Sequence, residues 1–69
     1  MKKGWQLVYS TGQTHLAEIM KSVLHDQGIE TFVVDKRDSS YVALGEIEFY
    51  VRDEDAILAR IIAQQMNNE

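Results

Sequence analysis

The hydrophobic and polar positions of this chain predict five elements, in the order strand, helix, strand, strand, helix. Residues 5–10 (WQLVYS) form a short segment rich in aromatic and aliphatic side chains, which is typical of a strand. Apolar side chains then recur at helical spacing as far as about residue 27, which predicts a helix. Its apolar stripe consists of Leu16, Ile19, Met20, Val23 and Leu24.

Two signals mark the ends of this first helix. Ser10 and Gln13 stand at the spacing of a capping box, with Thr11 as a competing cap, so the helix is expected to begin here. Gly28 supplies the left-handed residue that commonly ends a helix. A second strand is therefore expected directly afterwards, over residues 29–36, where β-branched and aromatic residues dominate.

The most regular strand pattern lies at residues 46–52, where Ile47, Phe49 and Val51 alternate with polar or aromatic positions. The preceding residues 35–45 show no strong period and are interpreted as a loop or irregular hairpin. Three acidic residues at 53–55 then favour the start of a second helix, with Asp53 as a possible cap. The predicted apolar stripe of that helix is Ile57, Leu58, Ile61, Ile62 and Met66.

This order of elements predicts a single α+β domain over residues 1–69, with a β-α-β-β-α arrangement. A right-handed crossover between two parallel strands lets the third strand lie between them, as in split βαβ units. The result is a three-stranded antiparallel sheet with two helices on one face, ferredoxin-like but one strand short. In this arrangement the loops at residues 10–14 and 36–41 meet at the same end of the molecule.

Composition narrows the classes of function. The chain has 69 residues, a net charge of −4 and no cysteine, so a binder of nucleic acid backbones is disfavoured and disulfides are excluded. The basic start is followed by no apolar segment of signal-peptide or membrane-spanning length, so we expect a cytoplasmic protein that does not enter a membrane. A domain this small often gains stability from a partner subunit.

The shared end of the predicted fold is a candidate site for a small anion, such as a phosphate or a nucleotide. The amino end of a helix attracts anions, and basic and hydroxyl side chains gather near it. In the alternative interpretation, the hydroxyl groups only cap and turn the chain and the charges are solvated. The candidate ligand-binding residues are Ser10, Thr11, His15, Lys36, Arg37, Ser39, Ser40 and Tyr41.

Nothing in the sequence predicts catalysis, a metal site or a cofactor. His15 and His25 are ten residues apart on one predicted helix, too far to share a metal ion. Glu46 and Glu48 share a strand face, but exposed acidic residues are common and nothing indicates the raised pKa that acid catalysis needs. The expected protein is therefore not an enzyme.

The sheet face opposite the helices is a candidate interaction surface. The first strand carries apolar residues on both faces, so the sequence does not decide which of its two faces meets the helices. One face is expected to present Trp5, Leu7, Tyr9 and Tyr50 together, a patch that a monomer does not usually expose. The missing fourth strand also leaves the first strand as an unpaired edge. These features favour a homodimer or binding to another protein, and the alternative is a monomer with tolerated surface aromatics.

The chain resembles a family of small bacterial proteins of unknown function, described as putative prokaryotic signal-transducing proteins. The fold of that family is likened to the nitrogen-regulatory PII group. The resemblance rests on residues 8–11 (VYST), 17–19 (AEI) with Lys21, 28–30 (GIE), 38–41 (DSSY), 45–51 (GEIEFYV) and 54–56 (EDA). It implies a regulatory role but transfers no catalytic or ligand residues, and the long target-binding loop of PII proteins is absent from this sequence. We therefore expect a non-enzymatic regulatory or interaction module, with an anion sensor as the alternative.

Overall fold

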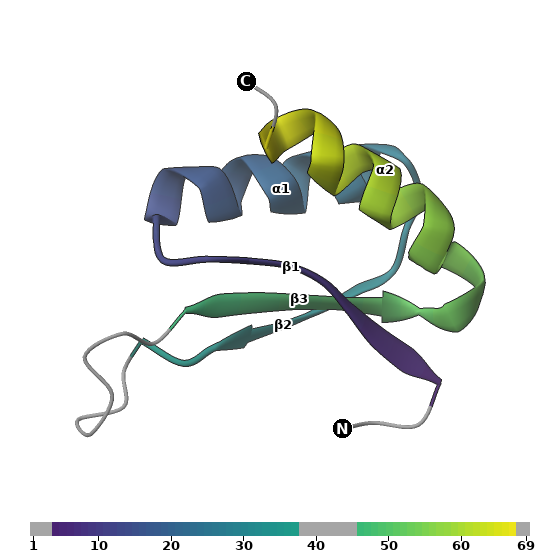
Figure 1. Cartoon of the computed structure of the whole chain (residues 1–69), viewed down its shortest axis with the longest axis horizontal. Helices are drawn as coiled ribbons and strands as arrows, with labels where there is room; N and C mark the ends of the chain where they lie inside the picture. The colour runs from purple at the N-terminus through teal and green to yellow at the C-terminus, as the bar shows by residue number, and fades with distance from the viewer. Residues whose placement is uncertain (1–3, 38–45, 68–69) are drawn as a thin grey trace.

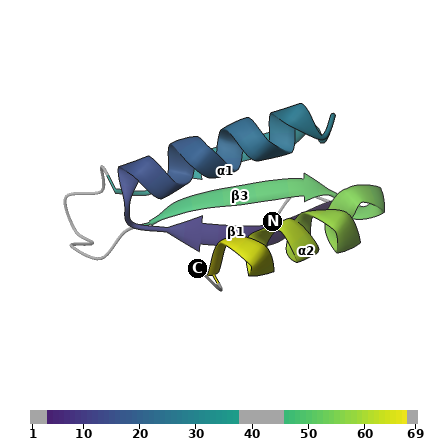
Figure 2. The same ribbon diagram turned by 90° about the horizontal axis from the view of Figure 1, so that it is seen from above.

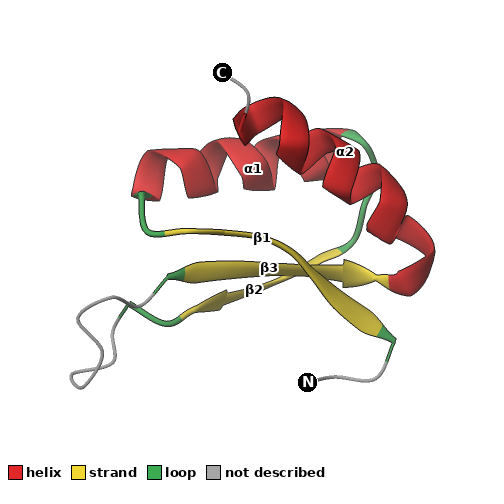
Figure 3. Cartoon of the chain, viewed as in Figure 1, coloured by secondary structure: helices red, strands yellow, loops and turns green. Residues whose placement is uncertain are grey.

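The computed structural model of the chain describes residues 4–37 and 46–67. These residues form an α+β fold with the order β-α-β-β-α, as the sequence predicts (Figures 1 and 3). The elements are β1 (Trp5–Thr11), α1 (Thr14–Asp26), β2 (Thr31–Asp35), β3 (Ile47–Arg52), the short 3-10 turn η1 (Asp53–Asp55) and α2 (Ala56–Asn67).

The three strands form one antiparallel sheet in the order β1-β3-β2. Both α1 and α2 lie on the same side of this sheet (Figure 1). Seen from above, α2 runs along the β1 side of the sheet and α1 runs along the other side (Figure 2). This is the expected ferredoxin-like arrangement lacking one strand, and β3 lies between β1 and β2 as predicted.

The core lies between the sheet and the two helices. Ile47, Phe49 and Val51 of β3 all face the helices and are buried, which confirms the alternation predicted for this strand. From α1, Met20 and Leu24 are fully buried against them. Because these side chains lose almost all contact with water, their apolar surface supplies most of the driving force for folding.

The turn after α1 follows the predicted helix ending. Gly28 has a φ of 74°, a left-handed conformation that glycine adopts without steric penalty. The carbonyl of Leu24 accepts hydrogen bonds from the amides of Gln27 at 3.2 Å and Ile29 at 3.0 Å, which closes the helix end. Because the Ile29 amide is bonded to the end of α1 and not to a strand, β2 begins at Thr31, two residues later than predicted.

The predicted buried face of α2 is confirmed for Ile62 and Met66 and is wrong for its other three residues. Its buried positions are Ala56, Ala59, Ile62 and Ala63, whereas Ile57, Leu58 and Ile61 are 76%, 45% and 48% exposed. The helix carries two apolar faces, and the face rich in alanine is the one that packs. Short alanine side chains suit a closely packed contact between helix and sheet, whereas Ile57, Leu58 and Ile61 lie on the outer face.

Neither predicted helix cap forms. The N-cap of α1 is Gln13, without a side-chain hydrogen bond, so neither Ser10 nor Thr11 caps this helix. Asp53 likewise does not cap, because the three acidic residues form the turn η1 before α2 begins. The carboxylate of Asp53 instead accepts a hydrogen bond from the side-chain amide of Gln6 at 2.9 Å. The Asp53 side chain thus binds a residue of β1 instead of capping a helix.

A bulge in β1 decides which of its side chains face the helices. Leu7 is opposite Tyr50 and Tyr9 is opposite Phe49, so one extra residue, Val8, is inserted between two consecutive pairs. A bulge of this kind breaks the strict alternation of side chains along a strand. Val8 and Tyr9 therefore both pack with the core, while Leu7 lies on the open side of the sheet.

Candidate functional site

The open face of the sheet carries a cluster of large apolar side chains from all three strands. Leu7 of β1, Tyr50 of β3 and Phe32 of β2 are direct neighbours in the strand register and so form a row across the sheet. Phe32 also contacts Trp5, with ring centroids 6.0 Å apart, and Tyr50 at 6.3 Å. We call Trp5, Leu7, Phe32 and Tyr50 the open-face cluster.

None of the described elements covers this cluster. Leu7 and Phe32 are 42% and 40% exposed, while Trp5 and Tyr50 are half-buried by their neighbours. Both helices lie on the opposite side of the sheet, where they cannot shield it (Figure 1). Contiguous exposed aromatic and aliphatic side chains on a small domain commonly mark a binding surface.

Ion pairs flank the cluster at both ends. At one end, the guanidinium of Arg52 lies over the ring of Trp5, 5.0 Å from its centroid, and its Nε is 3.0 Å from the Glu30 carboxylate. This carboxylate raises the pKa of Arg52. At the other end, the Lys36 ammonium lies 3.2 Å from Glu48. The open face thus has an apolar centre and a rim in which positive and negative charges are paired.

Tyr50 belongs to both the cluster and the rim. Its hydroxyl donates a hydrogen bond to Oε1 of Glu48 at 2.7 Å. This bond, with a further contribution from Lys36, holds the pKa of Glu48 below its usual range, and the same bond raises the pKa of Tyr50. The position of the Tyr50 ring is therefore fixed by a charge-assisted hydrogen bond as well as by its contact with Phe32.

The open-face cluster differs from the predicted surface at two positions. The structure places Trp5, Leu7 and Tyr50 together, but Tyr9 lies on the helix side, where it is 8% exposed and its ring is 5.9 Å from that of Phe49. The bulge at Val8 moves Tyr9 to that side. Phe32 is not part of the predicted surface, because apolar and polar positions do not alternate clearly over residues 29–34. The pairing of Phe32 with Tyr50 is the signal that identifies it.

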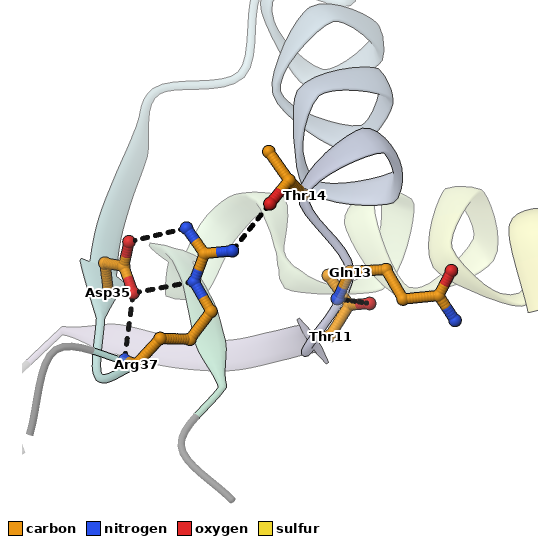
Figure 4. A network of polar contacts seen from close by, with 5 residues as sticks. All are labelled: Thr11, Gln13, Thr14, Asp35 and Arg37. Carbon is orange, nitrogen blue, oxygen red and sulfur yellow. Dashed lines mark hydrogen bonds and ion pairs between the residues drawn. The ribbon is translucent and has the colours of Figure 1, made fainter. Parts of the chain in front are cut away.

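The polar end of the molecule holds the other candidate site. The carboxyl ends of β1 and β2 meet there, beside the start of α1, as the topology predicts (Figure 1). Arg37 links these segments: its guanidinium binds both carboxylate oxygens of Asp35, at 3.0 and 3.1 Å, and donates to the Thr14 hydroxyl at 2.6 Å (Figure 4). The Asp35 carboxylate also accepts a hydrogen bond from the Arg37 backbone amide, and these hydrogen bonds lower the pKa of Asp35.

Five of the eight predicted anion-binding residues are described by the structure, and both basic ones are paired with carboxylates of the chain. Lys36 is paired with Glu48 of the open-face rim, and Arg37 is paired with Asp35. Thr11 is buried, and its hydroxyl accepts a hydrogen bond from the Gln13 amide at 3.1 Å. Ser10 and His15 are exposed. The other three candidates, Ser39, Ser40 and Tyr41, lie outside the described residues.

Cavities lie on more than one side of α1. A pocket of about 200 Å³ between α1 and β2 is lined by groups of both charges, including Glu18, Lys21, Asp35 and Arg37. An open groove of about 380 Å³ between α1 and α2 is mainly apolar, lined by Leu16, Ile19, Val23, Ile62, Gln65 and Met66. No cluster of three metal-binding side chains occurs within residues 4–37 and 46–67. In that same part of the chain, no helix has the length and apolar character needed to cross a bilayer.

The fold and its open aromatic face define a small α+β domain of the ferredoxin-like kind, one strand short. The chain belongs to the family described as "Putative prokaryotic signal transducing protein", whose pattern matches residues 5–67. This match confirms the resemblance found in the sequence. Comparisons with curated proteins and with solved structures found no match.

Proposed function

We propose that this protein is a non-enzymatic interaction module in signal transduction and that its open-face cluster binds a partner protein. The observation that carries the proposal is the row of Leu7, Tyr50 and Phe32, with Trp5 beside it, on a sheet face that no described element covers. Aromatic anchors within a polar rim are typical of protein interfaces. The family's description as signal transducing agrees with this role.

The charged groups near the cluster support a non-catalytic role. A general acid that works near neutral pH needs a raised pKa, so that it still holds its proton. Both Glu48 and Asp35 have lowered pKa values, because each accepts hydrogen bonds from a neighbouring donor. These carboxylates are therefore suited to fixing Tyr50 and Arg37 in place.

The alternative function, a sensor of a small anion at the polar end, receives less support from the contacts. Arg37 and Lys36 each form an ion pair with a carboxylate of the chain, so an incoming anion has to compete with Asp35 and Glu48. A sensor predicts that Lys36→Ala with Arg37→Ala abolishes binding of inorganic phosphate. Wild-type protein that binds no phosphate in a calorimetric titration rejects phosphate as its ligand.

The partner is sought with a photo-crosslinking amino acid placed at position 32, in the open-face cluster. A matched control carries it at position 64, which is exposed on α2. We expect a discrete adduct from position 32 only, and its partner is then identified by mass spectrometry and purified. Discrete adducts from position 64 alone would show that the helix side is the binding surface.

Binding of the purified partner is measured through Trp5, the only tryptophan in the sequence. Because Trp5 belongs to the cluster, its fluorescence reports directly from the proposed interface. We expect Leu7→Ser with Phe32→Ser to weaken binding at least about tenfold, since interface anchors usually contribute more than 1 kcal/mol each. The matched control, Ile57→Ser with Ile61→Ser, removes two exposed apolar side chains from α2. Weaker binding in the control alone contradicts the proposal.

A further inference from the structure

Strand β1 has a neighbouring strand on one side only among the described residues, so it exposes backbone groups along its other edge. The direction of these groups follows from two hydrogen bonds. The Asp53 amide donates to the Gly4 carbonyl at 2.9 Å, so the backbone of residue 4 points toward β3. Backbone groups alternate in direction along a strand, so those of Trp5 and Leu7 point to the free edge.

The same reasoning applies beyond the bulge. The Lys36 amide donates to the Glu46 carbonyl at 3.1 Å, so residue 46 points toward β2 and Ile47 points toward β1. Thr11 is opposite Ile47 and therefore points toward β3, which leaves the backbone of Ser10 directed to the free edge. The bulge thus divides the free edge into two parts, with Trp5 and Leu7 in one and Ser10 in the other.

The two edges of the sheet differ in how they are protected. Natural proteins discourage pairing at an edge with charged residues, prolines, bulges or short strands. The β2 edge has five residues and ends in Asp35, followed by Lys36 and Arg37. The β1 edge has seven residues, WQLVYST, with no charged residue and no proline, and within the strand itself the bulge is the one feature that discourages pairing. An added strand is therefore favoured at β1.

We propose that a second copy of this chain binds there, with the two β1 strands antiparallel across a twofold axis. The product is a six-stranded sheet in the order β2-β3-β1-β1-β3-β2, and the two open-face clusters then lie on one continuous face. The pairing uses the edge of the sheet and not its face. It therefore goes beyond the proposed function and can fail independently of it.

A second copy suits this edge because a twofold axis brings each strand against its own sequence. Like charges cannot meet along β1, since the strand has none. Beside the edge on the helix side, Arg60 donates to the Gln6 side chain at 2.8 Å and Gln6 donates to Asp53. Each copy therefore brings one positive and one negative group to this flank, so the two flanks are electrostatically compatible.

The size of the sheet also favours pairing. The strands β1, β2 and β3 hold seven, five and six residues, so one copy offers a face only three short strands wide. Two sheets joined at β1 present a face twice as wide, which gives a partner protein more surface to contact.

The direct test is amide hydrogen exchange measured by NMR at several protein concentrations. We expect the amides of Trp5, Leu7 and Ser10 to become protected as concentration rises. The amides of Thr31 and Asp35 provide the control, because the same alternation directs them to the β2 edge. Exchange at Trp5, Leu7 and Ser10 that does not change with concentration would overturn the proposal, as would equal protection of both edges.

A second test uses proline, which lacks the amide hydrogen and is tolerated at an outward-facing position of an edge strand. Ser10→Pro should give a monomer of 7.9 kDa by light scattering, whereas the wild type and Thr31→Pro should have twice that mass. A dimeric Ser10→Pro, or a monomeric wild type at millimolar concentration, would contradict the inference. If Ser10→Pro fails to fold, the exchange experiment on the wild type decides. Leu7→Ser with Phe32→Ser separates the two proposals, because it should weaken partner binding and leave the mass unchanged.

Discussion

At the scale of single residues, Glu48 connects the open face to the polar end of the molecule. Its carboxylate accepts a hydrogen bond from the Tyr50 hydroxyl at 2.7 Å and forms an ion pair with Lys36 at 3.2 Å. Its side chain is 20% exposed, so water screens these contacts only in part. A buried carboxylate without such donors would have a raised pKa, whereas here hydrogen bonding to the ionised form outweighs desolvation.

This balance gives Glu48 a pH-dependent contribution to stability. Because its pKa is lower in the folded state, the ionised form stabilises the fold above the ordinary glutamate range. The contribution is lost as pH falls from the ordinary glutamate range through the lowered folded pKa. We expect Glu48→Gln to reduce the free energy of unfolding by about 1 kcal/mol at pH 7 and by less at pH 3.

Urea unfolding of the wild type and of Glu48→Gln at both pH values measures this difference. Tyr50→Phe serves as the control, because it keeps the ring and removes the hydrogen-bond donor. It should shrink the pH-dependent part of the Glu48→Gln effect. A Glu48→Gln effect of equal size at pH 7 and pH 3 would show that the charge of Glu48 does not stabilise the fold.

At the scale of elements, α2 illustrates how packing selects one of two apolar faces. Ala56, Ala59 and Ala63 are each 5% exposed or less, so the alanine-rich face of the helix is the one that packs in the core. Hydrophobic periodicity alone favours the bulkier residues as the buried stripe, because it weighs side chains by their apolar character. It takes no account of the distance between helix and sheet.

Substitutions on the two faces of α2 should therefore differ sharply. Ala59 is fully buried, so Ala59→Leu adds three carbon atoms to a filled space and should lower the free energy of unfolding by about 2 kcal/mol. Ile57 is 76% exposed, so Ile57→Ser should change the free energy of unfolding by less than about 0.5 kcal/mol. Urea denaturation midpoints compare the two variants, and a larger loss in Ile57→Ser would mean that the outer face is covered in solution.

The same elements show what the sequence can and cannot predict. The order of elements, the central position of β3 and the turn at Gly28 follow from local patterns, because alternation, helical spacing and glycine conformation act within a few residues. The face occupied by Tyr9 depends on one inserted residue, Val8, whose effect is set by pairing with β3. Trp5 and Leu7 could be placed together from the sequence, but their neighbour Phe32 depends on the register between strands.

At the scale of the whole molecule, size explains why both an edge and a face are left open. A chain of 69 residues has a small core, so its stability is modest when it folds alone. Pairing at β1 would add backbone hydrogen bonds between copies without enlarging the chain. It would also tie the stability of each copy to that of the other, because unfolding then requires dissociation.

This link predicts that thermal stability depends on protein concentration. For a dimer that unfolds to two separate chains, each tenfold rise in concentration adds about 1.4 kcal/mol to the stability of the dimer by mass action. The unfolding midpoint of the wild type, followed by circular dichroism, should therefore rise steadily between 1 μM and 1 mM. Ser10→Pro should show a constant midpoint over this range, since it unfolds as a single chain. A wild-type midpoint independent of concentration would mean that folding and self-association are separate, and the β1 edge would then have to be unpaired in the folded protein.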